Sequence, residues 1–145
     1  MFGQWTLWEL VRTPQLAKLI EEELSDLINN IELVEGDGGE GTVLKITFPP
    51  DTPGFSVYKE KFTKVDNEKR VKEPQVVEGG HLNLGFTMYL VRLEVIEKGV
   101  HSCILKITIE YDLKEESAAN ASMVSIQPLA MIADVVAKRL IQNKA

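Results

Sequence analysis

In the stretch CILKITIEYD (residues 103–112), apolar side chains occupy the odd positions, and polar ones occupy the even positions from Lys106 onward. A period of two is typical of a β-strand that buries one face. Weaker forms of the same pattern recur upstream, and each is followed by a short turn signal. The expected strands are 31–33, 43–48, 55–66, 69–78, 82–96 and 101–114. Hairpin connections between about six such strands predict an antiparallel meander.

The two ends of the chain have a helical period instead. Two short helices are expected before residue 30, the second with Thr13 as its N-cap and Pro14 as its first residue. Residues 117–143 form a long helix with an apolar stripe too wide for a surface position, and Pro128 should kink or break it. We therefore expect one α+β domain over residues 1–145, with a curved antiparallel sheet wrapped around the C-terminal helix.

Composition excludes several classes of partner. The net charge is −6, and the basic residues between Lys59 and Lys72 are interrupted by acidic ones, so we expect no nucleic-acid partner. The chain has neither the basic start of a signal peptide nor about eighteen consecutive apolar residues, which predicts a cytoplasmic protein without a membrane partner. Cys103 is the only cysteine, so no intramolecular disulfide can form, and we expect a small buried apolar side chain.

One pair of residues has the chemistry of an acid–base site. Glu60 shares a strand face with Tyr58 and Phe62, and Lys72 follows on the next predicted strand. A turn at Asp66-Asn67 would bring Lys72 opposite the region of residue 60. Inside an apolar cavity the pair would exchange protons, whereas on the outer surface it would be a weak cross-strand salt bridge. The period alone favours the surface salt bridge.

Other candidate sites are weaker. The glycine-rich loop 36–41 lacks the Lys-Ser/Thr of a phosphate-binding loop and joins two strands, so we expect a hairpin. His81 and His101 each stand alone beside a turn, which predicts exposed hairpin residues. No metal-ligand spacing is present, and we expect neither a metal site nor a cofactor.

Several segments together resemble a known family. They are EGDGGEGTVL (35–44), YKEKF (58–62), VDNEKRVK (65–72) and EGGHLNLG (78–85). These segments are similar to the plant pathogenesis-related class-10 proteins, the major birch pollen allergen family, and within it to the norcoclaurine synthase branch. YLVRLE (89–94) and ESAANAS (116–122) are similar above all to the norbelladine synthase type. The resemblance extends over about residues 7–143.

The resemblance implies a helix-grip fold with an apolar cavity between the sheet and the C-terminal helix. It also implies a lyase of plant alkaloid biosynthesis that condenses tyramine or dopamine with an aromatic aldehyde through an imine, as a Pictet–Spenglerase does, without a cofactor. Two alternatives stay open. One is a non-catalytic defence-type protein of the same family that binds a hydrophobic plant metabolite. The other is an isomerase or cyclase of a later alkaloid.

The resemblance also assigns roles to single residues. Lys72 matches the lysine that handles protons on the carbinolamine and iminium, Glu60 the proton-shuttling glutamate, and Tyr58 the tyrosine that orients substrate. We also expect Phe62, Met88 and Val91 to contact the substrate. With these roles, the inward-facing arrangement of Glu60 and Lys72 becomes the favoured one.

The sequence departs from the family pattern at two places. Val91 stands where norcoclaurine synthases have a cavity aspartate, which argues against efficient ring closure. The family fold also begins with a strand before its two helices, and here only residues 1–6 precede them. In that fold the first strand pairs with the last, so we expect a homodimer or a higher assembly in which the edge of 101–114 is paired or covered by a partner chain, and a frayed monomer with an opened cavity is the alternative.

Overall fold

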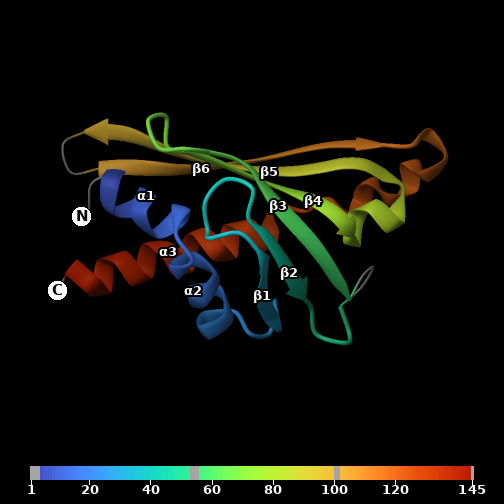
Figure 1. The fold of residues 1–145 in the computed structure, drawn as a ribbon, viewed down its shortest axis with the longest axis horizontal. Coiled ribbons are helices and arrows are strands. Elements are labelled where there is room, and N and C mark those ends of the chain that lie inside the picture. Colours follow the sequence, from blue (N-terminus) through green and yellow to red (C-terminus); the bar gives the residue numbers. More distant parts are fainter. Residues whose placement is uncertain (1–3, 53–55, 100–101, 145) are drawn as a thin grey trace.

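The computed structural model describes residues 4–52, 56–99 and 102–144, and shows a curved antiparallel sheet with helices on one side (Figure 1). Each strand of the six-stranded sheet pairs with the next one in the chain. The strands are β1 (Asn30–Glu35), β2 (Val43–Thr47), β3 (Val57–Asp66), β4 (Val71–Gly79), β5 (Phe86–Gly99) and β6 (Ser102–Leu113). The predicted meander and the α+β class are confirmed.

The helices are arranged along the concave side of the sheet (Figure 1). They are α1 (Gln4–Arg12), α2 (Gln15–Glu23) and α3 (Gln127–Lys144), with the 3₁₀ helices η1 (Gly80–Leu84) and η2 (Glu115–Met123). Helix α1 contacts β5 and β6, and α2 packs against α3. The grip of the sheet on its C-terminal helix is therefore present, with α1 and α2 closing one end.

Two helix predictions were wrong in their bounds. Thr13 does not cap α2, because its hydroxyl donates to the carbonyl of Glu9, 2.8 Å away in α1. The N-cap of α2 is Pro14, and the helix ends at Glu23. The expected long helix over 117–143 is divided into η2 and α3. Pro128 is the second residue of α3, where the helix does not need the missing N–H. The break that Pro128 predicted therefore lies just before α3.

The largest core cluster joins α1 and α3 to the last two strands. Trp8 and Val11 of α1 pack with Leu93 and Val95 of β5 and with Val136 of α3. The Trp8 indole Nε1 also donates to Asn67 Oδ1 at 3.0 Å, which fastens α1 to the turn between β3 and β4. A second cluster packs Ile20 and Ile28 on Ile46 of β2. Together these contacts hold α1 and α2 over one end of the concave face.

The stretch Glu115–Leu140 is long and apolar enough, by composition alone, to cross a membrane. The structure divides this stretch between η2 and α3. Val136 and Leu140 of α3 pack in the core, and Leu129 and Ile132 line an internal cavity. These apolar side chains of α3 therefore pack inside the domain.

We predict that Leu19→Ala lowers the free energy of unfolding by about 2–5 kcal/mol, because the side chain is 1% exposed and its removal leaves a cavity. Leu33→Ala is the matched control, since Leu33 is 57% exposed and loses little buried area. Urea denaturation followed by circular dichroism measures both. Equal losses in the two variants would contradict this description of the core.

Candidate active site

A cavity of about 240 Å³ lies between the concave face of the sheet and the helices. Its wall is largely apolar, with side chains from all six strands and from α1, α2 and α3. The polar side chains on the wall belong to Thr13, Asp37, Thr42, Tyr58, Glu60 and Lys72. Cavities of this kind bind small molecules through apolar contact and a few placed polar groups.

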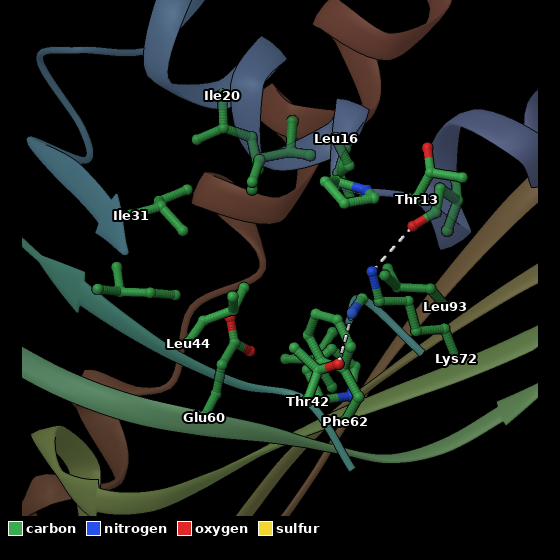
Figure 2. Close-up of a pocket in the computed structure, with 18 of the residues that line it drawn as sticks. Thr13, Leu16, Ile20, Ile31, Thr42, Leu44, Glu60, Phe62, Lys72 and Leu93 are labelled. Atoms are coloured by element: carbon green, nitrogen blue, oxygen red, sulfur yellow. Dashed lines mark hydrogen bonds between the residues drawn. The ribbon is translucent and has the colours of Figure 1, made fainter. Parts of the chain in front are cut away.

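Strand alternation brings the predicted residues to the cavity. Tyr58, Glu60 and Phe62 occupy alternate positions of β3, and all three line the cavity, as does Lys72 from β4. Figure 2 shows Glu60 and Lys72 projecting from the sheet into the same space below α2. The surface salt bridge that the period favoured is therefore excluded.

A β-bulge sets the relative position of these residues. The register shifts between Phe62 and Lys64, so Thr63 is the extra residue, and its hydroxyl donates to the Glu73 carbonyl at 2.9 Å. Lys72 pairs with Val65, not with the region of residue 60 as expected, because the turn between the strands already pairs Asp66 with Val71. The shift keeps Lys72 on the inner face, further toward α1 than Glu60.

The Lys72 ammonium is held at the end of α1. Its side chain is 3% exposed, and Nζ donates to the carbonyl of Val11 at 2.9 Å. The carbonyls of the last helical turn have no partner within the helix, and they form the negative end of the helix dipole. Nζ also lies 4.0 Å from the centroid of the Phe62 ring, a cation–π contact. The hydrogen bond to Val11 and the contact with the Phe62 ring hold the ammonium in one position.

Burial shifts the pKa values of Glu60 and Lys72 toward pH 7. Burial raises the pKa of Glu60 to about 7, against the lowering effect of Lys72. Burial also lowers the pKa of Lys72 to about 8, against the raising effect of Glu60. Both groups therefore change protonation near neutral pH, which suits a donor and an acceptor of protons. Burial first, and then Glu60, raises the pKa of Tyr58, so its hydroxyl stays protonated and can donate.

Tyr58 is supported from behind by an aromatic group that sequence reasoning missed. His81 is 6% exposed, so the expectation of an exposed hairpin residue was wrong. Its ring stacks on Tyr89 with centroids 3.6 Å apart, and its centroid lies 6.3 Å from that of Tyr58. Burial lowers the pKa of His81 to about 4, so the ring is neutral at physiological pH.

Gly80 makes room for Tyr58. Its φ is 52°, and a Cβ there would lie 2.7 Å from Cδ2 of Tyr58. Any larger residue would push the tyrosine ring from its place on the cavity wall. The Gly79-Gly80 pair, first taken as a turn signal, therefore positions a site residue, and the 3₁₀ helix that it opens buries His81.

The remaining predicted residues have different positions. Val91 lines the cavity, but Met88 does not. Met88 precedes Tyr89, which packs in the core, so alternation along β5 turns Met88 to the opposite face. Cys103 is half-buried and packs at the edge of the α1 cluster. His101 lies outside the described residues. In the ranges that the structure describes, no group of His, Cys, Asp or Glu side chains could hold a metal ion.

Residues 6–141 match the family model described as the pathogenesis-related protein Bet v 1 family. The chain belongs to this family. It is 48% identical over 139 residues to norbelladine synthase of Narcissus pseudonarcissus, covering 96% of this chain and 85% of the relative. It is 36% identical over 141 residues to S-norcoclaurine synthase 2 of Papaver somniferum, of which the match covers only 61%. The family resemblance seen in the sequence is therefore confirmed.

A solved structure agrees with the fold of the chain. It is the X-ray structure of norcoclaurine synthase from Thalictrum flavum in complex with dopamine and hydroxybenzaldehyde. The TM-score is 0.88 at 37% identity, and the match covers 99% of this chain and 83% of that one. The helix-grip architecture expected from the resemblance is thus confirmed.

We predict a reciprocal change of the two pKa values. In Lys72→Met, the pKa of Glu60 rises above its value of about 7, because the ammonium that lowers it is gone. In Glu60→Gln, the pKa of Lys72 falls below about 8, because the carboxylate that raises it is gone. Carbon-13 and nitrogen-15 NMR titrations of the labelled side chains measure both shifts. Two unmoved pKa values would show that the groups do not interact.

Proposed function

We propose that the chain condenses a phenethylamine, tyramine or dopamine, with an aromatic aldehyde through an imine, as a lyase of alkaloid biosynthesis. The observation that carries this proposal is the cavity with Tyr58, Glu60 and Lys72 on one wall, where Asp37 is the one further titratable side chain among the described residues that line it. Similarity to norbelladine and norcoclaurine synthases supports it. The solved relative with dopamine and hydroxybenzaldehyde bound supports the choice of amine and aldehyde.

In the proposed reaction, Glu60 first accepts a proton from the substrate ammonium, because only the neutral amine is a nucleophile. The amine nitrogen then bonds to the aldehyde carbon, and a proton moves from that nitrogen to the carbonyl oxygen, which gives a carbinolamine. Lys72 donates a proton to the hydroxyl, which leaves as water while the nitrogen lone pair forms the C=N bond of the iminium ion. Glu60 finally returns its proton to Lys72, so no net proton is consumed.

The placement of the groups suits this sequence. The Val11 carbonyl and the Phe62 ring keep Lys72 in one place, and its pKa of about 8 makes it a better proton donor than an exposed lysine. The Tyr58 hydroxyl stays protonated and orients the aldehyde or a substrate phenol by hydrogen bonding. Phe62 and Val91 supply apolar contact to the aromatic rings.

A second candidate function is the binding of a hydrophobic plant metabolite without catalysis. The apolar wall of the cavity, which includes Val91, favours it. The family also contains pollen allergens such as the alder protein, which is 29% identical to this chain over 110 residues. In either function we propose a cytoplasmic protein. Incubation with tyramine and a panel of aromatic aldehydes, followed by mass spectrometry, separates the two candidates, because only the enzyme forms product.

Lys72→Ala should lower the rate of product formation by about 10²–10⁴-fold, because the iminium then forms without a positioned proton donor. Lys61→Ala is the matched control, since Lys61 is exposed on the same strand pair and does not line the cavity. Circular dichroism checks that both variants fold. Unchanged turnover in Lys72→Ala would favour the carrier function.

The chain should stop at the imine or cyclise it poorly, because Val91 offers no carboxylate to take up a proton during ring closure. Borohydride added to the reaction would donate hydride to the imine carbon and give a secondary amine of the norbelladine type. Mass spectrometry distinguishes it from the cyclised product. Val91→Asp should raise cyclisation at some cost in stability, since a carboxylate is then buried. Rapid cyclisation by the unaltered chain would refute this proposal.

A further inference from the structure

The loop between β1 and β2, residues 36–41, carries a charged side chain at the mouth of the cavity. Asp37 belongs to the lining of the cavity, yet it is exposed to solvent. A side chain that contacts both lies at the opening between them. The other charged side chains of the described lining, Glu60 and Lys72, come from strands β3 and β4 of the inner wall. A ligand that enters on this side therefore meets Asp37 first.

The loop is tied to the strand that carries Glu60. Thr42 is 1% exposed, and its hydroxyl accepts from the Gly38 N–H at 2.8 Å (Figure 2). The Thr42 carbonyl in turn accepts from the Phe62 N–H at 2.8 Å. Strand β3 therefore sets the position of the loop as well as the position of Glu60.

On its other side the loop packs against the start of α2. Gly38 has a φ of 102°, and a Cβ there would lie 3.2 Å from Cγ of Pro14. Pro14 is the N-cap of α2 and also lines the cavity. The loop thus reaches from the sheet to the helices at the mouth, and contacts on both sides fix where Asp37 lies.

One oxygen of the Asp37 carboxylate is in use and the other is available. Oδ1 accepts from the Gly39 N–H at 3.0 Å, a contact within the turn. Among the described residues, no hydrogen-bond donor or cation contacts Oδ2. Lys18 of α2 lines a separate hollow between the three α-helices. Lys45 lies between two cavity residues of β2, so alternation turns it to the outer face. The carboxylate is therefore placed to bind a cation of the ligand.

We propose that Asp37 binds the protonated amine of the phenethylamine at the mouth, and so selects a cationic aromatic ligand over neutral or anionic ones of similar shape. This inference rests on the proposed function, which supplies the amine. A primary amine of this kind is protonated at neutral pH, as a lysine is. Two unit charges about 4 Å apart in water attract each other enough to change an affinity about fivefold. Asp37 determines specificity, and Glu60, further in, takes the proton.

A charge-selective binding experiment tests this role without requiring turnover. Asp37→Asn keeps the Oδ1 that accepts from Gly39 and removes the charge. By isothermal titration calorimetry, this variant should bind tyramine about fivefold more weakly. Binding of 4-ethylphenol, which has the same ring and two-carbon chain without the amine, should change by less than about twofold. The anion 4-hydroxyphenylacetate should bind more tightly. Intact mass must be checked, because an Asn-Gly pair deamidates back to an acidic residue.

Asp51→Asn is the matched control, because Asp51 is exposed and does not line the cavity. It makes the same change of net charge and should alter tyramine binding by less than about twofold. Raising the salt concentration from about 20 mM to about 500 mM should weaken tyramine binding to the unaltered chain more than to Asp37→Asn.

The outcomes separate this inference from the proposed function. Unchanged tyramine binding in Asp37→Asn, or an equal loss for tyramine and 4-ethylphenol, would overturn the role of Asp37 alone. An unaltered chain that binds 4-ethylphenol but not tyramine would overturn both the role of Asp37 and the proposed function, because its cavity would then not accept the amine.

Discussion

The hydrogen bond from the Lys72 ammonium to the Val11 carbonyl is the contact on which the site depends. A lysine amine buried to 3% exposure needs a partner for its charge, and the end of α1 supplies one at 2.9 Å. Helix α1 can end there because the chain turns at Thr13-Pro14 into α2, and it is held there by Trp8 and Asn67. Strand β4 fixes the backbone of Lys72, but helix α1 determines where its ammonium lies.

Sequence reasoning predicted the features that follow from the alternation of residues within one strand and from the turns between strands. The alternation of Tyr58, Glu60 and Phe62 predicted that they share a face, and turn residues between the strands predicted the meander. Which face points inward did not follow, since both faces of β3 carry polar groups. The family resemblance supplied that choice, and the cavity confirms that Glu60 and Lys72 share it.

The errors have physical causes that period and composition do not contain. Lys72 pairs with Val65 because the turn pairs Asp66 with Val71, and the bulge at Thr63, which places Val65 and Lys72 on the same face as Glu60, leaves no periodic signal. His81 was placed on the surface because it follows two glycines, yet the 3₁₀ helix after them turns its ring onto Tyr89. Met88 was expected to contact the substrate, and the alternation of β5 places it on the face opposite the cavity.

The pair of buried charges also has a cost for the fold, whose sign follows from the pKa values. Glu60 has a raised pKa of about 7, so its contribution to stability is complete below its ordinary value of 4.5 and is lost as the pH rises through 7. Lys72 has a lowered pKa of about 8, so its contribution is complete above 10.5 and is lost as the pH falls through 8. Near pH 7–8 neither contribution is complete. The core contacts of α1, β5 and α3 must therefore hold the domain together in the pH range where the pair can exchange protons.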